Sequence, residues 1–552
     1  MSREFASVEE FKEWFEQHVM LGSKPYTLDS DQARAVLDDH KNTLVTARAG
    51  SGKTRVIVAK IAYLVANGLA DLHEIAAFMF NRTAAAEVNE RIGAVAVDGV
   101  ELKNWYGKEQ QIRVASTFHK FALDLVKLSG DCPELISESE RSKIIHQSLQ
   151  HKLRQQNQSL TPQRYEELLR LVSSFISRAG QKYAGKDGVE DLREDVEEYC
   201  RQYQDQEEYR ERILIHQLCL ATFNDYLLAL RPPKIDFNLL MSQATQILQS
   251  PAGHGAVLKK VAPLKYIMVD EYQDFSFLFF SIIQALRGVC PKAHLFAVGD
   301  DWQAINRFAG SDVNYFINFA DYFYEDNVNI SLMTNYRSDR QIVENANEYM
   351  LKYYNPQARR AIPFSKKRGK IKRVNPAKTK FDKSDIHEDG LHDARFQRAL
   401  AQTCGGKAQA YIEAAQLLKT VYKLMRKHRK QQILLLHRHN FTSFQNVTLD
   451  RFLEALKNLV VEHGIMTENQ FKERVRGMTM HKSKGLESDV VILLEANRDQ
   501  VLAQHHHAET FTIFGDCRAS EKADQHRLLY VALTRAKHRL YILTTDKRSP
   551  LT

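Results

Sequence analysis

One short segment constrains this chain more than any other. The apolar run 42–47 is followed closely by Ala49-Gly50-Ser51-Gly52-Lys53-Thr54. This pattern predicts a buried strand, then a glycine-rich loop that opens a helix. Such a loop turns backbone N–H groups toward a phosphate chain, while Lys53 neutralises the outer phosphates and the Thr54 hydroxyl holds Mg²⁺. The segment therefore predicts a P-loop that binds a nucleoside triphosphate; a plain Gly/Ser turn with a surface lysine is the alternative.

Two further predicted strands also end in polar side chains. The strand 266–269 is followed by Asp270 and Glu271, and the strand 294–298 leads to Gln303. Ligands of open α/β sheets bind at the carboxyl ends of the strands. We expect Asp270 to hold Mg²⁺ and Glu271 to orient and deprotonate the attacking water. Gln303 is placed to sense the γ-phosphate, whereas an acidic strand end followed by a helix cap is the alternative.

Composition narrows the range of partners. The formal net charge of +9 favours a polyanionic partner, because lysine and arginine neutralise phosphates and release counterions. The six cysteines are scattered without a C-x-x-C pair, so we expect neither a disulfide framework nor a zinc module. No signal pattern and no run of about twenty apolar residues is present, so the expected location is cytoplasmic, without a membrane span.

With these three strand ends in order, the chain resembles a superfamily 1 helicase of the UvrD/Rep/PcrA group over nearly its whole length. Further segments match the group's motifs in the expected order: 28–32, 78–87, 116–119, 335–338, 479–487 and 529–536. Within the group, the segment 299–305, with Trp302, is most similar to helicase IV-like members.

For the nucleotide, the resemblance implies that Gln32 reads adenine and that Arg337 and Arg535 are arginine fingers. The implied nucleotide-binding residues are Gln32, Ala49, Gly50, Ser51, Gly52, Lys53, Thr54, Arg55, Tyr336 and Glu487. The implied catalytic residues are Lys53, Glu271, Gln303, Arg337 and Arg535, and the implied metal ligands are Thr54 and Asp270. ATP and Mg²⁺ are therefore the expected cofactors. Phosphoryl transfer needs positive charge on the leaving phosphate, so closure of two lobes around ATP is expected to bring both arginines to Lys53.

For the nucleic acid, the resemblance implies contacts from six residues: Phe80, Asn81, Thr117, His119, Phe308 and His481. Aromatic rings stack on bases of any identity, which suits a motor that ignores sequence. Ordinary core packing is the alternative for Phe80 and Phe308. The basic block 366–373 is either a track for the DNA backbone or a solvated turn and strand, and the sequence leaves both open.

The expected architecture is an α/β fold with two RecA-like parallel-sheet P-loop lobes and a helical accessory domain inserted in the first. The predicted boundaries are 1–119 and 263–330 for the first lobe, 120–262 for the accessory domain and 331–552 for the second lobe. The family inserts a second large accessory domain between Arg337 and Thr479, which are only about 140 residues apart here. A strand of the second lobe is predicted at 432–438, and a helix predicted at 449–461 fills much of the space that remains before Thr479. We therefore expect this insertion to be reduced to roughly 441–475.

The turn after Gln303 departs from the family pattern. Asn306 replaces a tyrosine that would be a base-stacking platform, and Ala309 replaces an arginine that links the DNA contact to the ATP site. These departures leave the predicted ATP site intact but remove known links between it and DNA.

The expected function is an ATP-dependent 3′–5′ DNA helicase or translocase that acts on single-stranded DNA and on single-strand/duplex junctions. The reduced second accessory domain keeps another hypothesis open. In it, the chain is a DNA- or nucleotide-sensing ATPase that partners a nuclease in repair or anti-phage defence. Because the chain has no nuclease metal motif, that nuclease would be a separate protein.

Overall fold

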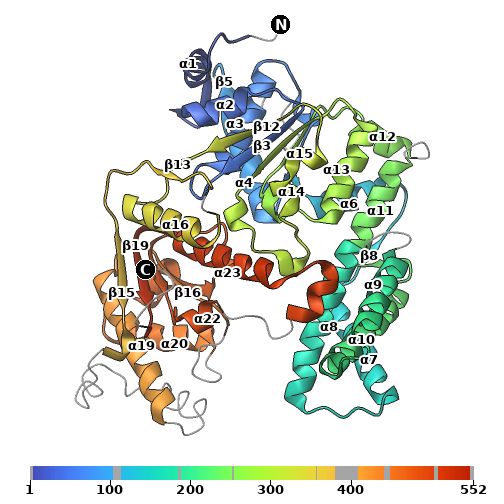
Figure 1. Ribbon diagram of the computed structural model, residues 1–552. Helices are drawn as coiled ribbons and strands as arrows, with labels where there is room; N and C mark the ends of the chain where they lie inside the picture. Colours follow the sequence, from blue (N-terminus) through green and yellow to red (C-terminus); the bar gives the residue numbers. More distant parts are fainter. Residues whose placement is uncertain are drawn as a thin grey trace. The chain divides into compact units, whose positions relative to one another are not determined.

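The computed structural model forms two compact units, each around its own parallel sheet (Figure 1). Unit 1 comprises residues 1–47, 52–332 and 505–520, and unit 2 comprises 48–51, 333–504 and 521–552. The residues that the structure describes are 4–102, 114–183, 188–250, 254–355, 357–378, 408–440, 448–502 and 508–546.

Six parallel strands form the sheet of unit 1, in the order β12-β3-β11-β10-β4-β7. Their bounds are β3 Asn42–Ala47, β4 Ile75–Met79, β7 Ala115–Thr117, β10 Tyr266–Val269, β11 His294–Gly299 and β12 Asn327–Leu332. The strands predicted at 42–47, 266–269 and 294–298 are thus confirmed. A buried apolar cluster lies on each face of the sheet, which explains why the strands are apolar along their length.

The P-loop opens helix α3 (Lys53–Ala66), which is buried along ten consecutive residues from Val56 to Val65. Other elements of this lobe are α1 Val8–His18, α2 Ser30–Leu37, α4 Arg82–Gly93, α13 Phe277–Val289, α14 Asn314–Ile317 and α15 Phe319–Tyr322. A small antiparallel sheet has the order β2-β1-β5-β6, with bounds Lys24–Pro25, Val19–Leu21, Val95–Val97 and Val100–Glu101.

Four long helices of unit 1 share a separate apolar cluster (Figure 1). They are α7 Glu138–Gln155, α8 Pro162–Lys182, α9 Gly188–Tyr203 and α10 Arg210–Ala229. By contrast, α6 (Phe118–Leu128), α11 (Phe237–Gln249) and α12 (Gly255–Val261) bury their apolar side chains in the core of the first sheet. The accessory domain predicted at 120–262 stays a proposal, and its central helices 138–229 are the part with their own core. The short strands β8 (Glu134–Leu135) and β9 (Lys234–Ile235) pair at its base.

Five parallel strands form the main sheet of unit 2, in the order β15-β19-β18-β16-β17. Their bounds are β15 Lys370–Val374, β16 Ile433–His437, β17 Val475–Thr479, β18 Ser488–Leu493 and β19 Ala536–Leu543. The strand predicted at 432–438 is confirmed, and two parallel sheets with helices confirm the α/β class. The other elements are β13 Thr334–Asn335, β14 Ile362–Pro363, α16 Arg340–Tyr353, α19 Ala408–Lys427, α22 Arg498–Val501 and α23 Arg518–Leu533.

Between β16 and β17, the described residues form two helices, α20 (Leu449–Glu462) and α21 (Glu468–Arg474). The helix predicted at 449–461 is confirmed. Residues 441–447 of the predicted reduced insertion lie outside the described part of the chain, so the reduction of this accessory domain stays a prediction.

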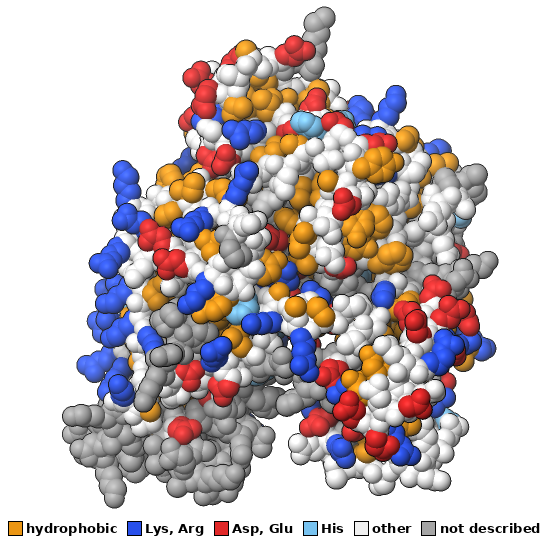
Figure 2. Space-filling view, viewed as in Figure 1, with side chains coloured by type: hydrophobic (Ala, Val, Ile, Leu, Met, Phe, Trp, Pro, Cys, Tyr) orange, Lys and Arg blue, Asp and Glu red, His pale blue; other side chains and the backbone are white. Residues whose placement is uncertain are grey.

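Among the described strands β15 pairs with β19 alone, so the basic block lies at an edge of the second sheet. Figure 2 shows Lys and Arg side chains gathered along the flank of unit 2 that carries β15. An exposed edge strand rich in lysine also discourages pairing with another chain, so the structure leaves both interpretations of this block open. No described helix is long and apolar enough to cross a membrane.

A buried lysine joins the P-loop helix to the helix before it. The Lys60 ammonium donates to the carbonyl oxygens of Val36, at 2.9 Å, and Asp38, at the C-terminal end of α2. These carbonyls have no partner within their own helix, so the cation satisfies them and fixes α2 against α3. Burial, opposed by the carboxylates of Asp38 and Asp39, lowers the pKa of Lys60 to about 8.

We expect Lys60 to make the free energy of unfolding rise between about pH 8 and pH 10.5. In this window the unfolded chain still binds the proton that the folded chain has released, so stability increases with pH. The rise should amount to roughly 3 kcal/mol. Denaturant unfolding at a series of pH values should show this contribution in the native sequence and not in Lys60→Met. Lys41→Met, which removes a partly exposed lysine paired with Glu325, should keep it; an unchanged slope in Lys60→Met would contradict the assignment.

Candidate nucleotide site and nucleic-acid groove

The start of helix α3 combines a left-handed glycine with a lysine that faces a carboxylate. Gly52 has φ +87°, a conformation that glycine adopts without steric cost, and it precedes the first helical residue, Lys53. The Lys53 ammonium lies 3.4 Å from Glu271 Oε2, and both side chains are largely buried. A helix N-terminus and a cation together suit a phosphate group, which would compete with Glu271 for the lysine.

Two predicted nucleotide contacts lie beside this loop. Gln32 is buried, and its side-chain amide nitrogen lies 2.9 Å from the position that a Cβ at Gly52 would take. Its amide oxygen accepts from the Asp29 N–H at 3.3 Å in a capping box. Arg55 stacks over the ring of Tyr26 at 4.5 Å, and burial raises the pKa of that phenol to about 12. The structure therefore places Gln32 and Arg55 beside the P-loop; that they contact a nucleotide stays a prediction.

A chain of hydrogen bonds runs from Glu271 to Gln303 across two strand ends. The Gln273 amide donates to Glu271 Oε2 at 2.5 Å and accepts from the Asp300 N–H at 2.8 Å. The Gln303 amide then donates to Asp300 Oδ2 at 2.6 Å. Gln273, Asp300 and Gln303 are all buried, so these bonds are made where water does not compete. Glu271 itself has φ 51°, a conformation that is strained for a residue with a side chain and that occurs often at functional sites.

Sequence analysis missed Gln273. Its signal was present, because Gln273 follows the two acids Asp270 and Glu271 within the same strand-end segment. What the sequence could not supply was its second partner, the backbone of Asp300 on the neighbouring strand.

The residues at this strand end fit a magnesium ion that is shared with phosphates. Asp270 lies at the carboxyl end of β10 and accepts from the Glu271 N–H at 2.9 Å, and Thr54 lies in the first turn of α3. Among the described residues, no group of three or more His, Cys, Asp or Glu side chains forms a metal cluster. Mg²⁺ in phosphate sites is typically held by one or two protein oxygens, water and the phosphates themselves, so this sparse donor set suits it.

Both predicted arginine fingers of unit 2 meet around Thr534. Arg337 donates to Glu487 Oε2 at 2.7 Å and to the Thr534 carbonyl at 3.3 Å. Arg535, which is 1% exposed, donates to the Thr534 hydroxyl at 3.0 Å and to two backbone carbonyls. Burial alone would raise the pKa of Glu487, but Lys537 and Arg337 hold it below its ordinary value. Unit 2 thus brings these three predicted residues together; that the arginines reach the γ-phosphate beside Lys53 stays a prediction.

By its contacts, the P-loop segment 48–51 groups with unit 2. The Asn335 amide donates to the Ala49 carbonyl at 2.6 Å, and the Tyr336 N–H donates to the Gly50 carbonyl at 2.9 Å. Tyr336 is 41% exposed, and its ring lies against Phe364 with centroids 4.8 Å apart. An exposed aromatic ring beside the loop suits the nucleotide contact that the resemblance implies for Tyr336.

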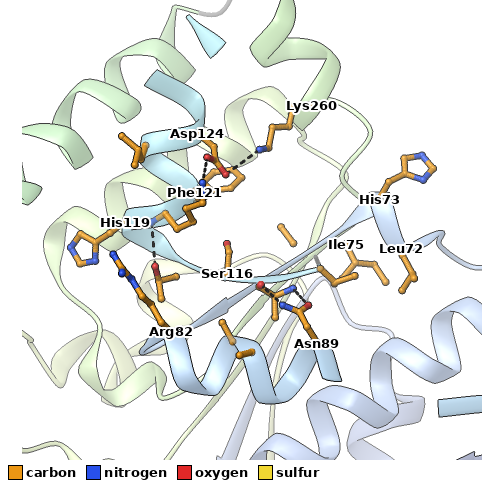
Figure 3. Close-up of a pocket in the computed structure, with 18 of the residues that line it drawn as sticks. Leu72, His73, Ile75, Arg82, Asn89, Ser116, His119, Phe121, Asp124 and Lys260 are labelled. Atoms are coloured by element: carbon orange, nitrogen blue, oxygen red, sulfur yellow. Dashed lines mark hydrogen bonds and ion pairs between the residues drawn. The ribbon is translucent and has the colours of Figure 1, made fainter. Parts of the chain in front are cut away.

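A groove of about 1540 Å³ crosses the ends of β4 and β7 in unit 1 (Figure 3). Figure 3 shows His119 and Arg82 at one side and Leu72 and Ile75 at the other. The cations that line the groove are Arg82, Lys120, Lys259 and Lys260, against the acids Glu90 and Asp124. A basic groove along β4 and the edge strand β7 suits a polyanionic strand.

Four predicted nucleic-acid contacts line this groove: Phe80, Asn81, Thr117 and His119. Asn81 and Thr117 cap helices α4 and α6, since their side chains accept from the N–H groups of Ala84 and Lys120. His119 lies edge-on to Phe237 at 4.9 Å, and burial lowers the pKa of its imidazole. Phe80 is 48% exposed, which argues against the core-packing alternative.

The groove and the nucleotide site share a boundary. A small cavity of about 20 Å³ is lined by Phe80, Thr117 and His119 on one side and by Asp270 and Glu271 on the other. Side chains of the groove and the carboxylates of Asp270 and Glu271 therefore line the same small cavity, so a shift of either carboxylate changes the surroundings of the groove side chains.

The remaining two predicted contacts lie elsewhere. Phe308 is 60% exposed in a 3₁₀ turn of unit 1 (Arg307–Ala309), so core packing does not explain it. His481 opens a turn after β17 in unit 2, with its Nδ1 3.4 Å from the guanidinium of Arg438. Burial, and then the charge of Arg438, lowers the pKa of His481 to about 4, so its imidazole is neutral near pH 7.

Comparison with known proteins gives matches over both units. Residues 28–324 match the UvrD/REP helicase N-terminal domain family, and residues 378–547 match the UvrD-like helicase C-terminal domain family. DNA helicase IV of Escherichia coli (strain K12) is 27% identical over 99% of this chain and 71% of its own length. ATP-dependent DNA helicase UvrD1 of Mycobacterium leprae (strain TN) is 26% identical over 60% of this chain, and Rep of Salmonella typhimurium (strain LT2) is 28% identical over 55%. The chain covers 40% of the length of each of these two proteins.

We expect Gln273→Leu to lower ATP turnover roughly ten- to a hundredfold, because it removes the hydrogen bond that orients a charged carboxylate. Affinity for a fluorescent ATP analogue should change little, since Gln273 contacts Glu271 and not the P-loop. Steady-state ATPase assays and nucleotide titrations check both. Gln243→Leu is the control, because that amide donates to Asp131, an exposed residue outside the proposed site. Turnover within twofold of the native value in Gln273→Leu would rule out the assigned role.

Proposed function

The chain belongs to the UvrD/Rep helicase family, and on that premise we propose that it is an ATP-driven motor that moves 3′ to 5′ along single-stranded DNA. The direction and the substrate follow the family pattern of the motifs. The contacts within unit 1 support the coupling of ATP hydrolysis to DNA.

The observation that carries this proposal is the series of contacts in unit 1 that runs from Lys53 to Gln303, a few residues before the turn that bears Phe308. It passes from Lys53 to Glu271 and through the buried bonds of Gln273 to Gln303. Only a few residues separate Gln303 from the exposed Phe308 ring. A γ-phosphate that displaced Glu271 from Lys53 would alter the first contact, and the buried bonds provide a physical route from that change to the base-stacking turn.

The proposed chemistry uses this chain's side chains in distinct roles. Lys53 neutralises the outer phosphates, and Glu271, oriented by Gln273, takes a proton from the attacking water. Arg337 and Arg535 offset charge on the leaving phosphate, and their release after hydrolysis resets the motor.

Thr54 and Asp270 would hold Mg²⁺, which when bound neutralises charge on the β- and γ-phosphate oxygens. This role needs only the hydroxyl at the start of α3 and the carboxylate at the end of β10. Both groups belong to unit 1.

On the nucleic-acid side, the exposed rings of Phe80 and Phe308 would stack on bases, while cations of the groove neutralise phosphates. His481, neutral near pH 7, would add a hydrogen-bonding contact from unit 2. The matched families and the relatives named above include no nuclease partner and no defence system, so the sensing alternative gains no support.

We expect Lys53→Ala to lower DNA-stimulated ATP turnover by at least about a hundredfold, because it removes the positive charge that neutralises the outer phosphates. Affinity for a labelled dT oligonucleotide should stay within about threefold, since Lys53 lies outside the groove lining. Lys472→Ala, which removes an exposed lysine of α21, is the matched control. Native turnover in Lys53→Ala would refute the nucleotide site.

Direction is tested by displacement of streptavidin from biotinylated oligonucleotides. A 3′–5′ motor should speed release from the 5′ end and not from the 3′ end, and only with hydrolysable ATP. Faster release from the 3′ end would overturn the proposed polarity. Unwinding of a 3′-tailed duplex by the lone chain would then separate a helicase from a translocase.

A further inference from the structure

We call the helices α7–α10, which share their own apolar core, the helical subdomain. A short segment of unit 1, residues 508–520, packs against this subdomain, and we call that segment the strap. The chain just before and after residues 505–520 belongs to unit 2. The Lys182 ammonium donates to the Ile513 carbonyl at 3.1 Å, and His216 Nε2 lies 3.0 Å from the Thr510 carbonyl. Phe511 is buried among the helices of the subdomain. The strap is therefore fixed to the accessory helices by several independent contacts.

A buried carboxylate of the strap, Asp516, forms an ion pair with helix α8. Both of its oxygens accept from the guanidinium of Arg178, with Arg178 Nη2 2.8 Å from Oδ1. The two side chains are about 10% exposed. The same guanidinium lies over the rings of Phe511, at 5.2 Å, and Phe514, at 4.9 Å. A bidentate pair held between aromatic faces fixes the position of Asp516 closely.

Asp516 also faces a second arginine, which belongs to the turn that carries Phe308. Arg307 Nη1 lies 3.7 Å from Asp516 Oδ1, and Arg307 immediately precedes Phe308. The carboxylate therefore lies between the guanidinium groups of α8 and of this turn. Without its negative charge, two cations would face each other in a poorly solvated place, and the turn would be pushed away from α8.

The turn is packed against α8 at another point. Gly310 has φ +88°, and a Cβ built there would lie 2.6 Å from Gln181 Oε1. Gln181 is one helical turn beyond Arg178, so both contacts come from the same face of α8. The turn 307–310 thus rests on the accessory helix through a close backbone approach and through Asp516.

We propose that Asp516 is a positioning residue for DNA binding: by holding Arg178 and Arg307 together, it fixes the turn that presents Phe308 to a base. The inference rests on the proposed function, in which Phe308 is a stacking platform.

The test uses the full chain and measures DNA-stimulated ATPase against dT oligonucleotide concentration. Phe308→Ala should raise the DNA concentration for half-maximal stimulation about tenfold, and Asp516→Asn should raise it by at least about fivefold. The double variant should be no more than about twofold worse than Phe308→Ala, because Asp516 acts through Phe308. The loss should fall mainly on this concentration and less on turnover at saturating DNA.

Two variants and a melting curve separate positioning from simple folding. Glu211→Gln breaks an exposed pair with Arg164 in the same subdomain and should leave the half-maximal concentration unchanged. Gly310→Ala keeps all three charged side chains but displaces the turn from Gln181, so it should reproduce the effect of Asp516→Asn. Gly464→Ala, at a similar φ with open space around it, controls for backbone strain. If Asp516→Asn lowers the melting temperature too far for assay, Gly310→Ala decides.

Native half-maximal concentrations in Asp516→Asn and Gly310→Ala, together with a defect in Phe308→Ala, would overturn the positioning role. A double variant whose defect is the product of the two single defects would also overturn it, because Asp516 would then act independently of Phe308. If Phe308→Ala itself binds DNA as the native chain does, the stacking role in the proposed function fails instead.

Discussion

The buried amide of Gln273 is the contact on which the rest of the site depends. One end of this side chain orients the carboxylate of Glu271, and the other end accepts from the backbone of Asp300 on the next strand. Parallel pairing of β10 and β11 places these two strand ends side by side. Because the amide is buried, neither bond can be exchanged cheaply for water, so the two strand ends respond together to a change at either one.

Further contacts lead from Asp300 toward the proposed nucleic-acid side. Gln303 hydrogen-bonds to Asp300, and the turn that bears Phe308 follows directly. That turn then rests on helix α8 and the strap through Asp516. The helical subdomain is thus more than an insertion between strands of the first lobe, because it supports one wall of the proposed DNA contact.

Prediction from the sequence was strong where chemistry and periodicity coincide. The strand at 42–47 and the lysine after it could be read directly, because an apolar run that ends in glycines has few other structural explanations. The residues of the groove were implied by resemblance, and the structure brings Phe80 and His119 together at one sheet edge. Asp516 could not be found in this way, because its partners Arg178 and Arg307 are distant in sequence and an isolated aspartate carries no pattern. For Gln273 the two acids before it gave a signal, but its second partner, the backbone of Asp300, follows another strand.

The sequence by itself determined the parallel α/β class, the P-loop and the two acids at the next strand end, Asp270 and Glu271, because these depend on local patterns of apolar and polar residues. Tertiary structure alone decided which polar side chains became buried links. The carboxylate of Asp516 meets Arg178 only because the strap returns to the accessory helices more than three hundred residues later in the chain. Such a contact depends on the geometry of closure between distant segments, which no local pattern encodes.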